Sequence, residues 1–225
     1  MKIIATYLLL TAVAIVGMTA CSGEDDNPFT TNYRYDLVTY QGYHGGTAVF
    51  QYLGRDDSTA LTLQATMPEP TKIKAGQRVL LHYNIDAVPS LYLREITVQY
   101  ITHANVASDS LRVNTKEISQ YSRHPIRLRS LWRTGNYLNL RCEVEFTTSP
   151  RALYLMADKA TLDSDTIDCY LVHDLLAAAD STYFWRSCYG SFYVGKAWER
   201  HSCRAIRVHI NDNIYPKVTH YDFNK

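Results

Sequence analysis

Histidine is the residue type in this chain that most invites a search for metal or acid–base chemistry. The chain has eight: His44, His82, His103, His124, His173, His201, His209 and His220. None forms an HExxH motif, and no two stand four apart on a helix or two apart on a strand, the spacings that would place ligands on one face. The sequence therefore predicts no metal and no cofactor. His173 ends a strand-like run, and we expect its role to be structural rather than catalytic.

Other catalytic patterns are also missing from the sequence. There is no GxSxG elbow for a nucleophilic serine, and no glycine-rich loop for phosphate. Asp163, Asp165 and Asp168 are closely spaced, but a calcium loop needs more acceptors and a glycine at its sharp turn, so we interpret them as a solvated turn. The two carboxylates of a glycoside hydrolase can lie far apart in a sequence, so this class stays open as an alternative. We predict no enzyme and no catalytic residue.

Four cysteines follow the N-terminal region, at Cys142, Cys169, Cys188 and Cys203. Their even number is compatible with disulfides if the chain is exported, in three possible connectivities. Each also sits inside a strand-like run, where a buried free thiol is equally reasonable. No CxxC pair is present, so a zinc ribbon or a thioredoxin-type site is not indicated.

An aromatic cluster near the C-terminus is the best candidate for a contact surface. It contains Tyr183, Phe184, Trp185, Tyr189, Phe192, Tyr193 and Trp198. Residues of odd and even number point to opposite faces of a strand, so one set should pack the core and the other could meet a partner or a sugar ring. The predicted ligand-binding residues are Trp185, Tyr189, Tyr193 and Trp198.

A basic stripe at Arg127, Arg129 and Arg133, with Arg123 upstream, raises the question of nucleic acid. Lys2 lies in an N-terminal apolar stretch that reads as a signal to be removed. Without Lys2, 22 of the 23 basic residues remain, and they balance the 22 acidic ones. A neutral chain offers no electrostatic attraction to a polyanion, so we interpret the stripe as a solvated strand face and predict no nucleic-acid partner.

The N-terminal stretch indicates where the protein works. Residues 1–21 read as a basic start, an apolar run and Ala20–Cys21, followed by small and acidic residues. This resembles a bacterial lipoprotein signal, which implies that Cys21 carries the lipid and anchors the chain to a membrane. The acidic run resembles the surface-export signal of Bacteroidetes lipoproteins. The small, acidic and polar composition of residues 22–32 predicts a flexible tether.

The rest of the chain is organised as short strands. Five strand-like runs separated by turn residues fill 33–113, which favours a five-stranded OB-type barrel. The rhythm is lost over 114–125, a predicted linker. About seven further short strands over 126–225 favour a β-sandwich. We expect an all-β protein with two domains, and the 18 tyrosines suit such half-buried strands.

A resemblance to a known family rests on four segments of this sequence: GQRVLLHYNI at 76–85, WxxGNYLN from Trp132, DTIDCYLVHD with His173, and Ser191–Phe192. Together they resemble the NigD-like lipoproteins of Bacteroidetes. The resemblance implies an N-terminal OB-type domain, a C-terminal β-sandwich and an envelope location. The family has no established activity, so it implies no site residues.

These observations converge on a non-catalytic outer-membrane lipoprotein that faces the cell surface and binds an envelope protein or a glycan. One alternative is a subunit of a surface appendage, which would expose an edge able to accept a strand. The other is a glycan-active hydrolase.

Overall fold

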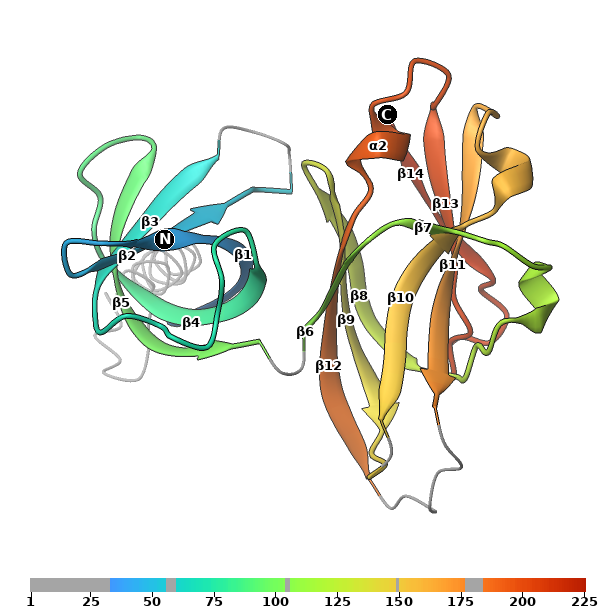
Figure 1. The fold of residues 1–225 in the computed structure, drawn as a ribbon, viewed down its shortest axis with the longest axis horizontal. Helices are drawn as coiled ribbons and strands as arrows, with labels where there is room; N and C mark the ends of the chain where they lie inside the picture. The colour runs from blue at the N-terminus through green and yellow to red at the C-terminus, as the bar shows by residue number, and fades with distance from the viewer. Residues whose placement is uncertain (1–32, 56–59, 104–105, 149, 177–183) are drawn as a thin grey trace, which may run out of the picture. The chain divides into compact units, whose positions relative to one another are not determined.

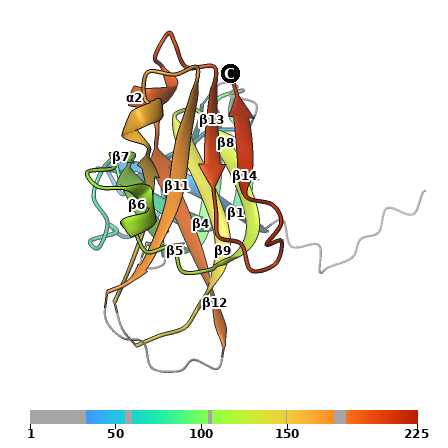
Figure 2. The same cartoon turned by 90° about the vertical axis from the view of Figure 1, so that its right-hand side faces the viewer.

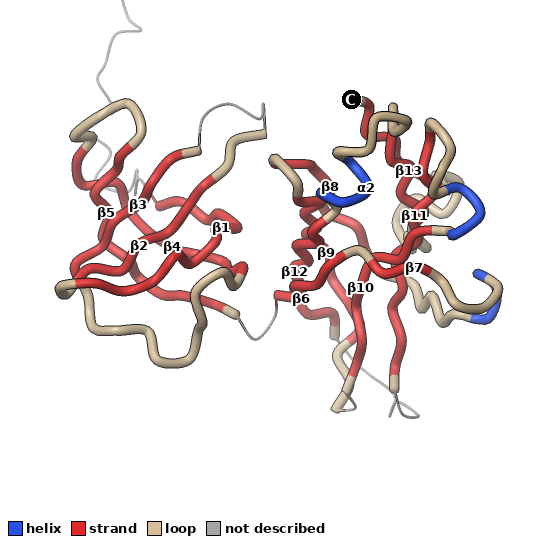
Figure 3. The backbone as a smooth tube through the Cα atoms, turned by 45° about the horizontal axis from the view of Figure 1, so that its top comes forward, coloured by secondary structure: helices blue, strands red, loops and turns tan. Residues whose placement is uncertain are grey.

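The structure is a computed structural model that describes residues 33–55, 60–103, 106–148, 150–176 and 184–225. The signal, Cys21 and the tether lie outside these residues. Tyr33–Lys225 form one compact unit. The predicted all-β class is confirmed, because strands make up most of the backbone in Figure 3. Among the described residues, no helix combines the length and apolarity needed to span a bilayer.

The first element is a closed five-stranded barrel, as predicted (Figure 1). Its strands pair in the order β1-β2-β3-β5-β4, with bounds Tyr33–His44, Thr47–Tyr52, Leu61–Thr66, Leu93–Thr102 and Arg78–Ala87. Gly45 and Gly46, with φ of 58° and 84°, form the two-residue turn between β1 and β2, where a hairpin requires left-handed backbone. Parallel pairing of β3 with β5 closes the barrel.

The second element is a β-sandwich of two sheets (Figure 2). One sheet has the order β14-β13-β11-β10-β7, with bounds His220–Asn224, Ala205–His209, Thr166–Leu175, Arg151–Ala157 and Arg112–Val113. The other has the order β6-β12-β9-β8, with bounds Val106–Ser110, Trp185–Tyr193, Tyr137–Glu145 and Arg127–Thr134. Short helices η1 (Ile118–Gln120), η2 (Lys159–Thr161) and α2 (Gly195–Trp198) lie between strands. Alternate residues of the two sheets fill a shared apolar core.

One predicted boundary differs from the strand pairing. The sequence pattern predicts 106–113 as part of the barrel domain, but β6 pairs with β12 and β7 pairs with β10, so these residues belong to the sandwich. Alternation shows that a segment is a strand but not which sheet it joins, because pairing partners are distant in sequence. The predicted linker 114–125 contains η1 and a bridge between Arg123 and His173. The division of the chain into two domains stays a prediction.

A β-bulge in β8 exchanges the two faces of the strand in its second half. The register with β9 shifts between Leu128 and Ser130. A bulge adds one residue to a strand and so exchanges the faces beyond it. Leu131 therefore packs on the sandwich core, and Trp132 takes the opposite face, the reverse of the simple alternation.

Candidate functional site

The barrel and one sandwich sheet enclose a cleft of about 600 Å³. The barrel contributes residues of β1, β2 and β4, and the sandwich contributes residues of β8, β9 and β12. Its lining residues are Tyr35, Asp36, Leu37, Tyr52, Leu53, Arg55, Leu80, Ser130, Trp132, Thr134, Arg141 and Tyr189. This volume is in the range typical of small-ligand sites, which is about 300–1,000 Å³.

Arg78, the first residue of β4, holds the two walls of the cleft together. Its side chain is only 2% exposed. On the barrel side it donates to the Thr39 hydroxyl (3.1 Å) and the Leu37 carbonyl (2.9 Å). On the sandwich side Nε donates to Ser191 Oγ (2.8 Å) and Nη2 to Asn139 Oδ1 (3.2 Å). The planar guanidinium can serve all four acceptors at once, which a lysine ammonium could not do in this arrangement.

The Arg78 charge is balanced by neutral groups rather than by an acid. All four hydrogen-bond acceptors are neutral oxygens, and the guanidinium carbon lies 4.5 Å from the centre of the Tyr137 ring. Burial lowers the pKa of Arg78 to about 10. The side chain therefore stays protonated at neutral pH, as a cation solvated by dipoles and an aromatic face.

Ser191 and Asn139 complete this network on neighbouring strands, where they are register partners. Ser191 Oγ donates to Asn139 Oδ1 (2.8 Å), and Asn139 Nδ2 donates to Thr134 Oγ1 (2.8 Å). Ser191 also accepts from Arg78, so its hydroxyl contacts an arginine and an amide instead of a general base. A serine in this setting is not activated as a nucleophile.

An aromatic ladder that the sequence pattern does not predict lies at the barrel side of the cleft. Tyr35, His82 and Tyr100 are successive register partners on β1, β4 and β5. His82 stacks on Tyr35 with ring centres 4.1 Å apart and meets the edge of Tyr100 at 4.6 Å. Tyr35 is 55% exposed, so one of its faces is available to solvent. The alternation of Tyr33 and Tyr35 was the signal in the sequence, but the pairing across three strands was not readable from it.

Charged groups lie among these aromatic rings. Burial raises the pKa of Asp36, opposed by a hydrogen bond from the Tyr83 hydroxyl (2.9 Å). Arg55 lies over the Trp132 ring with its guanidinium carbon 5.3 Å from the ring centre. Arg141 is exposed on the sandwich wall. The cleft thus combines flat apolar faces with planar hydrogen-bonding groups of both charges.

The four predicted ligand-binding residues have different environments, and whether they bind a ligand stays a prediction. Tyr189 lines the cleft. Tyr193 packs edge-on against Tyr137, 5.5 Å between ring centres, and Trp185 lies 3.9 Å from the guanidinium carbon of Arg127. Trp198 is 7% exposed and belongs to the sandwich core, so it offers no open face. Phe192 is also in the core, as its even number indicates.

The arginine stripe is engaged with other side chains. Arg129 forms a bidentate ion pair with Glu143. The guanidinium groups of Arg133 and Arg123 lie over the rings of Trp198 and Tyr170, respectively. These contacts explain the arginines as parts of the sandwich surface.

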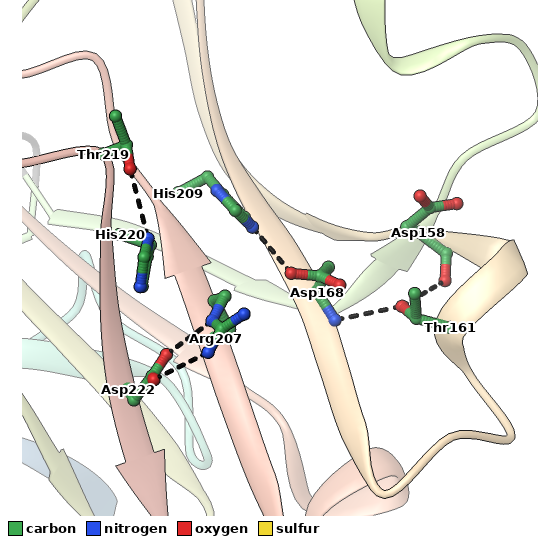
Figure 4. A network of polar contacts seen from close by, with 8 residues as sticks. All are labelled: Asp158, Thr161, Asp168, Arg207, His209, Thr219, His220 and Asp222. Carbon is green, nitrogen blue, oxygen red and sulfur yellow. Dashed lines mark hydrogen bonds and ion pairs between the residues drawn. The ribbon is translucent and has the colours of Figure 1, made fainter.

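The histidines and aspartates also have local partners. His209 Nε2 lies 2.7 Å from Asp168 Oδ1. The Asp168 amide donates to the Thr161 hydroxyl, and Arg207 pairs with Asp222 (Figure 4). No group of three or more His, Cys, Asp or Glu side chains within the described ranges is arranged to hold a metal ion.

His173 is buried and neutral. Burial lowers its pKa to about 4. Its Nδ1 lies 3.2 Å from the His124 carbonyl, which can only accept, and its Nε2 lies 3.3 Å from Arg151, which can only donate. The tautomer with the proton on Nδ1 satisfies both contacts. His173 therefore positions Arg151, a structural role.

In the part of the chain that the structure describes, Cys142, Cys169, Cys188 and Cys203 are thiols and form no disulfide.

Comparison with known proteins finds solved structures of similar fold. No protein-family model and no curated protein match the chain. Crystal structures do match, and the chain covers at least nine tenths of each of three. A Bacteroides vulgatus protein of unknown function is 14% identical over 86% of this chain and 90% of its own, with a TM-score of 0.62. A Bacteroides fragilis protein assigned as a lipoprotein is 11% identical, covering 85% and 97%, with a TM-score of 0.60.

The third similar structure bears on the resemblance stated from the sequence. It is a NigD-like immunity protein from Bacteroides caccae, 14% identical over 85% of this chain and 96% of its own, with a TM-score of 0.56. At this identity the likeness concerns the fold alone. The structural likeness thus supports the resemblance to the NigD-like family of Bacteroidetes, through a shared barrel-and-sandwich architecture.

Proposed function

We propose that this protein is a lipid-anchored envelope protein that binds a saccharide, without catalysis, in the cleft between barrel and sandwich. The observation that carries the proposal is the lining of the cleft. Tyr35, Trp132 and Tyr189 bring aromatic side chains, and Asp36, Arg55 and Arg141 bring planar charged groups. Sugar rings have apolar C–H faces that pack on aromatic rings, and hydroxyls that pair with carboxylate and guanidinium groups.

A rigid binding site is a second support for this function. Arg78 ties β1 of the barrel to β9 and β12 of the sandwich through hydrogen bonds that are all buried. Walls held in this way lose little freedom when a ligand enters, which lowers the entropic cost of binding.

Hydrolysis is disfavoured by the chemistry of the same cleft. Asp36 is the one carboxylate among the described lining residues, whereas glycoside hydrolysis uses two. Ser191 pairs with Arg78 and Asn139 and not with a histidine. The groups present hold a ligand but supply no acid–base pair.

An appendage subunit is disfavoured by the sheet edges. The barrel is closed and has no edge. In the sandwich, the edge strand β8 contains the bulge near Arg129, and the edge strand β14 exposes polar residues at alternate positions. Bulges and polar side chains are the devices by which proteins prevent strand addition.

The location in the proposal comes from the N-terminus. Lipidation at Cys21 would tether the barrel to the outer membrane, and the acidic run favours the cell surface. The Bacteroides fragilis relative in fold, assigned as a lipoprotein, agrees with an anchored state.

The test is binding of the detergent-purified full chain to an array of short neutral and acidic oligosaccharides, followed by calorimetry on each hit. Trp132→Ala and Tyr35→Ala should each weaken binding by about tenfold or more, since buried aromatic contacts dominate such sites. Tyr215→Ala is the matched control, because Tyr215 is 59% exposed, similar to Tyr35 at 55%, and does not line the cleft.

Two results would contradict the proposal. One is the absence of any hit on the array. The other is equal affinity of the cleft variants and the Tyr215 control, which would place the binding elsewhere. Crosslinking on intact cells would then show whether a protein partner occupies the cleft.

A further inference from the structure

Cys142 on β9 and Cys188 on β12 are direct register partners. The Cα atoms of opposed residues in an antiparallel pair lie about 4.5 or 5.5 Å apart, depending on the hydrogen-bonding position. Both values fall inside the 4.4–6.8 Å window that a disulfide needs. The two thiols are hydrogen-bonded to each other. The backbone therefore already holds them close enough to be linked without a strand moving.

The two thiols differ in access. Cys142 is fully buried in the sandwich core. Cys188 is partly exposed and borders a cavity of about 350 Å³ between the sheets. An incoming reagent can therefore reach Cys188 but not Cys142. Cys188 is therefore placed to act as the attacking cysteine and Cys142 as the resolving cysteine.

The local charges favour Cys188 as the thiolate. The hydrogen bond from Cys142 lowers the pKa of Cys188, with the nearby Arg151 charge as a further cause. The same hydrogen bond and burial raise the pKa of Cys142. Both shifts place the negative charge on the accessible sulfur.

Arg151 is held beside this cavity by fixed partners. Its Nη2 donates to the Glu145 carbonyl (2.5 Å) and to Thr147 Oγ1 (3.3 Å), and its Nη1 contacts neutral His173 at 3.3 Å. None of these groups is a carboxylate, so the arginine charge is not cancelled locally and remains available to the Cys188 thiolate.

We propose that Cys142 and Cys188 form a redox-active dithiol that is oxidised by exchange with a protein or small-molecule disulfide. The Cys188 thiolate attacks one sulfur of the incoming disulfide, a mixed disulfide forms, and the other sulfur leaves as a thiolate. Cys142 then attacks the Cys188 sulfur and passes its proton to the departing sulfur, which closes the intramolecular disulfide and releases the second half of the reagent as a thiol. Two protein thiols are oxidised and one disulfide is reduced to two thiols.

Cys169 and Cys203 provide an internal contrast. Both are buried, and burial raises the pKa of each. The Cys203 thiol donates to the Ala205 carbonyl (3.6 Å). They are not register partners and should not react.

The test uses the reduced full chain, purified in detergent, and the aromatic disulfide dithiobis(nitrobenzoate) as the probe. Wild-type protein should release two nitrothiobenzoate ions from this pair, retain no adduct on it, and yield a linked Cys142–Cys188 peptide by mass spectrometry. Peptide mapping distinguishes any reaction at Cys21 from reaction at this pair. Cys142→Ser should release one ion and keep the adduct on Cys188.

Further variants separate a reactive pair from an incidental one. Cys188→Ser should slow the reaction at this pair by about tenfold or more, and Arg151→Gln should slow the first step, since thiolate fraction controls the rate. Cys169→Ser, the matched buried control, should behave as wild type. A persistent adduct on wild-type Cys188, or a Cys188→Ser variant that reacts at the wild-type rate, would overturn the proposal. The wild-type peptide map decides this even if a variant does not fold.

Discussion

Replacing Arg78 by methionine is the most informative perturbation of this fold. Methionine keeps much of the apolar length but removes the charge and the donors. The buried acceptors on Thr39, Leu37, Asn139 and Ser191 then lose their shared partner. Ser191 and Asn139 still bond to each other, which leaves the Leu37 carbonyl and the Thr39 hydroxyl as the groups most affected.

The size of the effect follows from two opposed terms. Each buried acceptor that loses its partner costs about 1–3 kcal/mol, and hydrogen bonds from a charged donor lie at the strong end of the range. Against this, methionine removes the cost of burying a cation, a cost that sometimes makes apolar replacement stabilising. Four hydrogen bonds and the Tyr137 ring all stabilise the Arg78 charge. We therefore expect the loss of hydrogen bonds to outweigh the relief of desolvation, and the free energy of unfolding to fall by about 3 kcal/mol.

The assay is urea unfolding followed by circular dichroism and tryptophan fluorescence. Arg129→Met is the control, because Arg129 also makes two hydrogen bonds, to Glu143, but on the surface, where solvent screens an ion pair and its contribution to stability is small. An Arg78→Met protein as stable as the control would refute the reasoning, because it would mean that desolvation cancels the network. Separation of the two spectroscopic transitions in the variant alone would show that Arg78 couples barrel to sandwich.

Two further predictions concern the sandwich. The pKa of His173 is about 4 in the folded protein and 6.5 ordinarily, so the unfolded chain binds the proton more readily. The free energy of unfolding should therefore fall by up to about 3 kcal/mol as the pH is lowered from about 6.5 towards 4. His173→Gln should flatten this pH dependence, measured by urea unfolding. Gly190→Ala would place a Cβ 2.7 Å from two ring carbons of buried Phe192, so overpacking should cost about 1–3 kcal/mol and lower the melting temperature; an unchanged value would show that the ring can move.

Local sequence pattern predicted more of the fold than of the site. The alternation of β-branched and aromatic residues located the strands of both the barrel and the sandwich, because a strand that buries one face must repeat every two residues. The same rule placed Phe192 in the core and Tyr189 on the opposite face. It does not extend to Trp132, because the bulge in β8 exchanges the faces of the strand, or to Trp198, which lies in α2 and not in a strand.

The sequence by itself determined the all-β class, the strand positions and the expectation of a lipid anchor, since these depend on composition and on spacing along the chain. Only the tertiary structure decided that β6 and β7 join the sandwich, that Cys142 faces Cys188, and that Arg78 is buried. These features depend on which distant strands pair and in which register. That choice is made by the packing of the whole core, and no local pattern of residues encodes it.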